Sequence, residues 1–292
     1  MAVYERNYGR YQGPLTPSWS RFLILPRYAW KDVLDSRLFV GFYFLCFLLP
    51  FAGLLMIYLH HNLAALKFLN LPLEQLKEAL PINASFFRRG IEFQSWLCFL
   101  LALSVGPALV APDLRNNGLP LYLSRPFSRT EYVLGKMMVL MGLMSLITWI
   151  PGLLLFLFQG YLEGAGWLGQ NLRIGAALFV GSWAWILVVS LVVLAISAWV
   201  KWKPVARISL LIVFFVLTGF ARALNETLDT WWGYLLSLST AMSNVWAYLF
   251  GLEVDDSHFA QPVWAAWLTL IAGCALALWL LSRRIRAYEV VR

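Results

Sequence analysis

The sequence predicts an all-α integral membrane protein with six transmembrane helices in a single transmembrane domain, residues 1–292. Hydrophobic residues make up 61% of the 292-residue chain and charged residues only 13%, a balance far from that of a soluble domain. A bilayer core about 30 Å thick needs about 20 apolar helical residues, and six runs of about this length are present. Their continuous apolarity favours helices over a β-barrel. They lie at residues 38–59, 91–111, 137–160, 174–200, 208–224 and 262–282.

Residues 1–37 are expected to form a cytoplasmic tail and an interfacial helix before the first span. From 21 to 34, apolar side chains recur at steps of three and four residues and include Trp30, while Arg27 and Lys31 occupy other positions. Such a helix suits the headgroup layer, where it would lie flat. A soluble helix that packs on the protein's own loops is the alternative. No signal-peptide pattern is evident, so the N-terminus is expected to stay inside.

Residues 225–261 decide the topology, because 231–251 is long enough to span but has a polar middle. With six spans, 17 Lys and Arg residues fall on one face of the membrane and 6 on the other. Short basic loops stay in the cytoplasm, so this count favours six spans in the cytoplasmic (inner) membrane with both termini cytoplasmic. Residues 225–261 are then an outer re-entrant region, and a seventh span is the alternative. The polar residues are Ser237, Ser239, Thr240, Ser243 and Asn244.

The predicted spans have no Asp, Glu, Lys, Arg or His near their centres, although such groups mark proton relays and ion-coupled transport. The sequence also lacks a phosphate-binding Gly-rich loop, His-Glu-x-x-His, Cys-x-x-Cys and Gly-x-Ser-x-Gly. We therefore predict no catalytic, metal or cofactor residues, and no nucleic-acid partner. If the chain moves a substrate uphill, the energy has to enter from another subunit. Pro50 and Pro151 are expected to bend spans one and three.

The segment 112–136, between spans two and three, has an ordered local chemistry. Its opening proline is expected to end span two, and Asp113 to cap a short helix. Ser128 and Glu131 have the spacing of a capping box, so span three is expected to begin as a helix in the cytoplasm. Lys136 then marks the membrane interface. A short helix held rigidly between two spans can transmit a push to both of them.

The order of residues in this segment reads Asp113-x-Arg115, Gly118-Leu119, and Leu121-x-Leu123-Ser124-Arg125-Pro126-x-Ser128-Arg129-x-Glu131-Tyr132-x-Leu134-Gly135-Lys136. It resembles the loop between spans two and three of the ABC-2 type transporter permeases, although Leu119 directly after Gly118 departs from the family's Gly-Thr-Leu. The basic tail 283–292 is also similar to that of the family. The resemblance implies that the segment is a coupling helix that docks on an ATPase subunit. The coupling residues it implies are Asp113, Leu114, Arg115, Gly118, Leu119, Leu121, Arg125, Pro126, Ser128, Arg129, Glu131 and Lys136.

The resemblance further implies that the chain is the permease subunit of an ATP-driven exporter and not itself an enzyme. Two permease subunits, identical or siblings, would form the pathway, and ATP and Mg²⁺ would bind to the ABC ATPase subunits. The substrate is unknown, although apolar span interiors favour a hydrophobic or lipid-linked cargo. A polar dimer interface is the alternative, built from Ser145, Thr148, Gln159, Ser190 and Ser197.

Two other classes of function stay open at this point. The first is a structural or anchoring subunit, whose spans would assemble a larger membrane complex. The second is an intramembrane lipid-modifying enzyme with polar residues near the outer face. Its candidate residues are His60, His61, Glu92 and Arg222.

Overall fold

The computed structural model describes residues 17–62, 81–116, 118, 128–200, 202–253 and 261–285. Within these ranges all regular elements are helices, and six helical segments are long and apolar enough to cross a membrane. The prediction of an all-α, multi-pass membrane protein is therefore confirmed. The six segments are Arg37–His61, Ala84–Asp113, Arg129–Glu163, Leu172–Trp199, Lys203–Leu228 and Val263–Arg284.

Some of these segments consist of several shorter elements. Two elements are 3-10 helices, η1 and η4, and η3 is a π-helical turn. The order in the described residues is η1 (Ser18–Leu23), α1 (Ile24–Leu34), α2 (Arg37–His61), α4 (Ala84–Leu109), α5 (Ala111–Arg115), α7 (Arg129–Ile147), α8 (Trp149–Glu163), α9 (Ala165–Gln170), α10 (Leu172–Trp199), α11 (Lys203–Leu211), η3 (Ile212–Val216), α12 (Leu217–Leu228), η4 (Trp232–Leu236), α13 (Leu238–Phe250) and α14 (Val263–Arg284).

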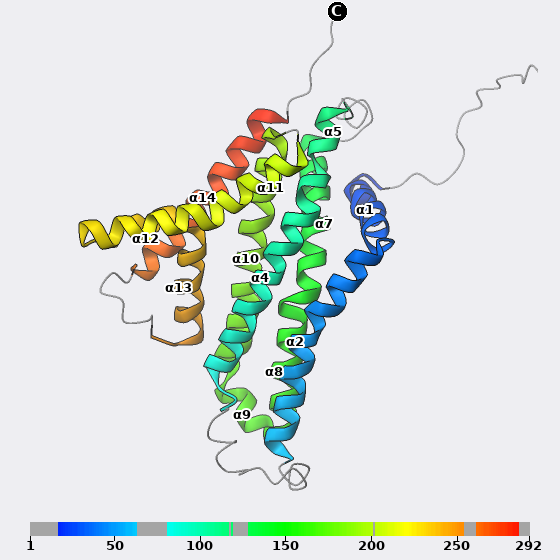
Figure 1. The fold of residues 1–292 in the computed structure, drawn as a ribbon. Coiled ribbons are helices and arrows are strands. Elements are labelled where there is room, and N and C mark those ends of the chain that lie inside the picture. The colour runs from blue at the N-terminus through cyan, green and yellow to red at the C-terminus, as the bar shows by residue number, and fades with distance from the viewer. Residues whose placement is uncertain are drawn as a thin grey trace, which may run out of the picture.

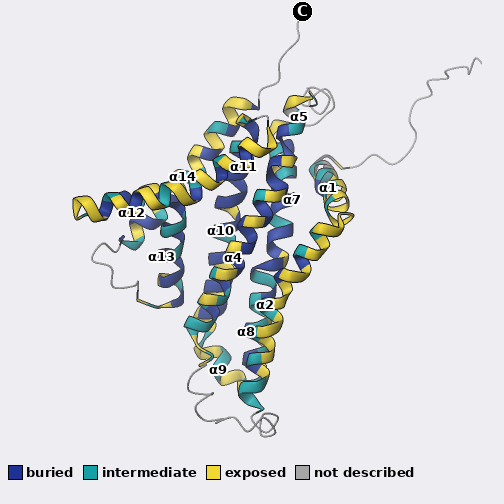
Figure 2. Cartoon of the chain, viewed as in Figure 1, coloured by how far each residue is buried: buried dark blue, intermediate teal, exposed yellow. Residues whose placement is uncertain are grey.

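The helices form an elongated bundle around α10, which packs against α4, α7, α8, α13 and α14. One end of the bundle collects α1, α5, the start of α11 and the end of α14, and α9 lies at the other end (Figure 1). The apolar parts of α4 and α10 are 67% buried, whereas that of α2 is 17% buried. Figure 2 shows the same contrast, with α2 and α12 largely exposed at the periphery. These exposed apolar faces suit contact with lipid.

Close contacts between the central helices depend on small residues. A Cβ atom at Gly106 of α4 would overlap the side chain of Val193 on α10. Gly181 of α10 lies against the indole ring of Trp246 on α13, with 2.7 Å between an added Cβ and the ring. Small residues let membrane helices approach closely enough for van der Waals packing. Side chains at these two positions would force the helices apart.

The segment 231–251 is not a seventh span in this structure, because it consists of the short η4 and α13. With 13 residues, α13 rises about 20 Å, which is less than the thickness of the hydrocarbon core. Its first residue, Leu238, packs against Gly273 in the middle of α14. At its other end, Arg173 of α10 donates hydrogen bonds to the carbonyls of Tyr248 and Leu249. α13 therefore covers only part of the length of the bundle.

Span three is broken into α7 and α8 at Thr148, three residues before the expected bend. Thr148 has φ −112° and ψ −95°, outside the helical region. Pro151 lies in the first turn of α8, where its missing N–H is tolerated. If α7 continued unbroken into α8, the proline ring would clash with the helical carbonyl four residues earlier. The proline therefore accounts for the break on its N-terminal side. Pro50, by contrast, lies within the continuous helix α2.

The five polar residues that were candidates for a dimer interface do not lie on the surface of the chain, so this alternative is wrong for them. All five are buried inside the single chain. Thr148, Gln159 and Ser197 have local hydrogen-bond partners, whereas the hydroxyl of Ser190 has none among the described residues. Thr148 donates to the carbonyl of Met144, and the amide oxygen of Gln159 lies 3.2 Å from the ring of His61. The buried residues are Ser145, Thr148, Gln159, Ser190 and Ser197.

Candidate coupling site at the junction of spans two and three

Span two continues past the expected stop as a bent helix. α4 ends at Leu109, the chain bends at Val110, and α5 begins at Ala111. Pro112 occupies the first turn of α5, where a proline needs no N–H partner and has a suitable φ. The proline therefore starts a new helical turn. The backbone N–H of Ala111 donates to the hydroxyl of Ser197 on α10 at 3.1 Å, which attaches the junction to the central helix.

The sequence predicted that Asp113 caps a short helix. This prediction is wrong, because the N-cap position of α5 is Val110. Its carboxylate instead faces α7. Oδ2 accepts a hydrogen bond from the hydroxyl of Tyr132 at 2.8 Å and lies 2.9 Å from the ammonium nitrogen of Lys136. One carboxylate oxygen therefore joins the end of span two to the first turns of span three.

The start of α7 has the predicted capping box. The hydroxyl of Ser128 accepts from the N–H of Glu131 at 3.2 Å, and the carboxylate of Glu131 accepts from the N–H of Ser128. Two N–H groups that the helix itself cannot pair are thus satisfied. α7 consequently has a fixed beginning eight residues before Met137, where the apolar span was expected to start.

Lys136 belongs to this junction. Its side chain is 12% exposed, and its ammonium group lies 5.6 Å from the centre of the Tyr132 ring as well as beside Asp113. The phenol of Tyr132 is fully buried. A charge pair that is mostly removed from water is destabilised strongly when one partner is lost, since the other charge stays buried. We call the group formed by Asp113, Tyr132 and Lys136 the junction clamp.

The remaining predicted residues comprise two exposed arginines together with Leu114 and Gly118, and four residues outside the described ranges. Arg115 and Arg129 are exposed and form no ion pair within the described part of the chain. The N–H of Gly118 donates to the carbonyl of Asp113 at 2.7 Å, and the backbone of Leu114 lies in α5. The coupling residues outside the described ranges are Leu119, Leu121, Arg125 and Pro126.

The N-terminal helix contributes a further contact that the sequence did not reveal. α1 packs against α7, and the indole N–H of Trp30 donates to the carbonyl of Val139 at 3.1 Å. Gly135 and Gly142 leave room for this contact, because an added Cβ would meet Leu25 at 2.8 Å or overlap the Trp30 ring. Their spacing of seven residues places both on one helical face, and this was the available signal. The helix that leaves the junction clamp is therefore held on another side by α1.

The candidate residues for a lipid-modifying enzyme do not form one site. The ring of His61 lies 3.7 Å from the carboxylate of Glu163, on α8, while Glu92 pairs with Arg88 at 2.9 Å. Arg222 is on α12, on the opposite side of the bundle from α2 (Figure 1). Within the described ranges, no three His, Cys, Asp or Glu residues are placed to bind a metal ion.

No protein-family model matches this chain, and no curated protein is detectably similar to it. The resemblance of the 112–136 segment to ABC-2 permeases therefore depends on the residues quoted for it, and the geometry of the junction is a separate observation.

Proposed function

We propose that this protein is the transmembrane permease subunit of an ATP-driven exporter of the ABC-2 type. In this proposal a separate ATPase subunit docks on the 112–136 segment. The observation that carries the proposal is the junction clamp, because it fastens both spans that border the segment to one carboxylate. A push applied between Asp113 and Ser128 would then reach α4 and α7 together.

The surroundings of the clamp support transmission of such a push. Ser197 links α5 to α10, and Trp30 links α1 to α7. These contacts lie at the end of the bundle that also holds the start of α11 and the end of α14 (Figure 1). Basic residues are frequent there, since Lys203, Arg207, Arg283 and Arg284 belong to these helices. By the positive-inside rule this end faces the cytoplasm, where an ATPase would dock.

The proposal also assigns roles outside this chain. ATP and Mg²⁺ would bind to the ATPase subunits, and a second permease subunit, identical or a sibling, would complete the pathway. The short helices η4 and α13 would form the re-entrant region on the outer side. Movement of α4 and α7 against the rest of the bundle would open and close the pathway.

Co-purification tests this proposal. Leu119 and Leu121 flank a proline, and the double substitution Leu119→Glu with Leu121→Glu would place charges on an apolar docking surface. The variant should insert into the membrane and unfold as the wild type does, yet lose the ATPase subunit that is expected to co-purify with the wild type. Leu71 and Leu73 provide a matched control, because they form a second Leu-Pro-Leu tripeptide predicted on the opposite face.

The control variant, Leu71→Glu with Leu73→Glu, should retain the ATPase. The proposal fails if the wild-type protein from its native membrane brings no ATPase with it. It also fails if the Leu119 and Leu121 variant binds the ATPase as tightly as the wild type. In the first case, a structural or anchoring role would be the better explanation.

A further inference from the structure

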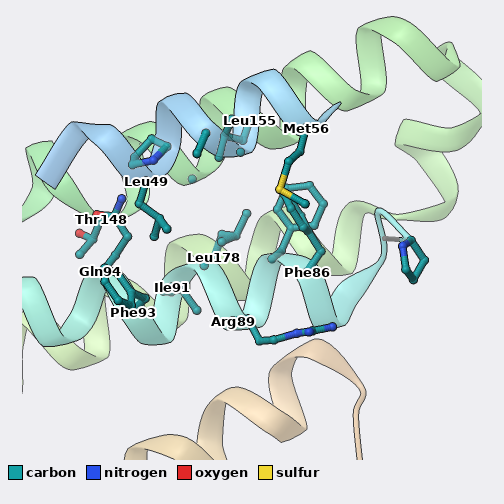
Figure 3. Close-up of a pocket in the computed structure, with 17 residues that line it drawn as sticks. Leu49, Met56, Phe86, Arg89, Ile91, Phe93, Gln94, Thr148, Leu155 and Leu178 are labelled. Carbon is teal, nitrogen blue, oxygen red and sulfur yellow. The ribbon is translucent and has the colours of Figure 1, made fainter. Parts of the chain in front are cut away.

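A cavity of about 340 Å³ lies between α2, α4, α8 and α10, away from the junction clamp. This volume falls in the range of sites that bind small organic molecules. Figure 3 shows its arrangement, with Met56 and Phe86 toward one end and Gln94 beside Thr148 at the other. Most of the wall is apolar. Its apolar residues include Leu49, Met56, Ile91, Leu155 and Leu178.

The break in span three helps to form this cavity. Thr148, at the break, and Gly152, in the first turns of α8, both line it, and so does Pro50 of α2. The hydroxyl proton of Thr148 is not available to a ligand, since it is donated to the carbonyl of Met144 at 2.8 Å. The polar end of the cavity therefore depends on Gln94.

Gln94 is the unusual residue of this site. Its side chain is 6% exposed, and its Oε1 atom has no hydrogen-bond partner among the described residues. Leaving a buried amide oxygen without a donor is costly, and more so in a membrane interior where water is scarce. Gln94 lines the cavity, so turning its amide toward that space would let a bound molecule with an O–H or N–H group supply the missing donor.

The interior of the cavity offers little to a charged ligand. Arg89 lines its edge, but its Nε atom donates to the carbonyl of Ser85 on the same helix, and Figure 3 shows the side chain running along α4. The neighbouring Arg88 points to a different cavity and pairs with Glu92. An amide oxygen inside an apolar wall instead selects an uncharged molecule with one hydrogen-bond donor.

We propose that this cavity binds a neutral, largely apolar molecule that carries one hydroxyl group and enters from the bilayer. Ala52 and Phe93 line the cavity and are exposed on the surface of the bundle, where lipid chains would surround them. The apolar body contacts the leucine and phenylalanine side chains, and the hydroxyl donates to Oε1 of Gln94. Binding requires no ATPase partner, so the inference stands or fails independently of the proposed function.

Photolabelling with two matched probes tests the site. The first probe is a 12-carbon alcohol with a diazirine in its chain, and the second is its methyl ether, which keeps the apolar body and lacks the donor. Each is added to the purified protein in lipid nanodiscs without any ATPase, and labelled peptides are identified by mass spectrometry. We expect the alcohol to label α2 and α8 saturably, and about tenfold more efficiently than the ether, as one buried hydrogen bond allows. Gln94→Leu should abolish the difference between the probes.

A cavity-filling substitution gives a second test that does not remove a polar group. Gly90 lines the cavity, and an added Cβ there would have no atom within 4 Å. Gly90→Leu should therefore fill the space, keep the melting temperature, and reduce labelling by the alcohol at least tenfold. Gly41 also has open space around its Cβ position but lies on α2 outside the cavity, so Gly41→Leu should label like the wild type.

The proposal is overturned if the alcohol and the ether label the wild-type protein equally. Labelling of the Gly90→Leu variant at the wild-type level would overturn it too, because the label would then report a different place. The absence of saturable labelling by the alcohol would overturn it as well, because water or lipid chains would then occupy the cavity.

Discussion

Asp113 and Lys136 form an ion pair across the junction of spans two and three, with 2.9 Å between the carboxylate oxygen and the ammonium nitrogen. The same oxygen accepts the hydroxyl of Tyr132. The pair therefore does more than neutralise two charges, because it fixes how α5 sits against the first turns of α7.

Asp113→Asn should destabilise the protein, because it removes the carboxylate charge that lies 2.9 Å from the largely buried ammonium group of Lys136. We expect a loss of about 1–3 kcal/mol, which corresponds to a fall of about 3–8 °C in melting temperature. Adding Lys136→Met should recover at least half of the loss, since the buried ammonium charge is then removed as well. Thermal unfolding in detergent measures both effects. Arg115→Gln, at an exposed position on the same short helix, is the control and should change the melting temperature by less than about 1 °C.

Gly142→Ala should displace α1 from α7, because the added methyl group overlaps the indole ring of Trp30. The exposed Arg27 and Lys31 of α1 should then be cleaved by trypsin about tenfold faster than in the wild type. Limited proteolysis with peptide mass spectrometry gives the rates. Gly219→Ala on α12, where a Cβ meets no other atom within 4 Å, should leave them unchanged. Equal rates in all three proteins would show that α1 does not depend on this contact.

The π-helical turn η3 should depend on two hydroxyl groups. The carbonyl of Phe214 accepts from Thr218 at 2.7 Å and from Ser239 of α13 at 3.3 Å. We expect Thr218→Val and Ser239→Ala each to cost about 0.5–1.5 kcal/mol, and the double variant more than their sum because the carbonyl loses both donors. Chemical or thermal unfolding of the three variants checks this. Thr227→Val, which removes an exposed hydroxyl bonded to Ala223 on the same helix, should have almost no effect.

If the proposed function is correct, the positive charges of Arg115 and Arg129 should attract the ATPase subunit and speed its association with the 112–136 segment. Charge reversal to Glu at both positions should weaken ATPase binding about tenfold at low salt, mainly through slower association, with a smaller effect at high salt. Binding kinetics of nanodisc-embedded permease at two salt concentrations measure this. The stability of the variant should not change, since both side chains are exposed. Arg222→Glu, on a helix remote from the junction, should leave the association rate unchanged. If it slows association as much as the double variant of Arg115 and Arg129 does, these two arginines have no specific role in docking.

Much of the fold was predictable because membrane spans and helix caps are local patterns. The six spans were found from apolar length, and their observed bounds extend beyond the predicted ones where polar residues continue the helices. The capping box of Ser128 and Glu131 was predicted from two residues at the correct spacing. The short length of α13 was expected from its polar middle, where Ser237 caps the helix and Asn244 bonds to Gln261.

The contacts between helices could not be predicted in the same way. The pairing of Asp113 with Lys136 depends on how α5 and α7 are rotated relative to one another, and a single sequence does not specify that rotation. For the same reason the sequence left open a polar dimer interface that includes Ser197 and Gln159, although both residues face the interior. The break at Thr148 was misplaced by three residues, because a proline disturbs the turn before it and not its own position.

The hydrogen bond from Trp30 to Val139 joins residues that are 109 positions apart in the chain. During synthesis, Trp30 emerges from the ribosome long before its acceptor exists. α1 can therefore reach its final position only after spans one and two and then α7 have been made. Assembly of this end of the bundle is thus a late step of biogenesis, because it needs the third span and also the later helices α10, α11 and α14.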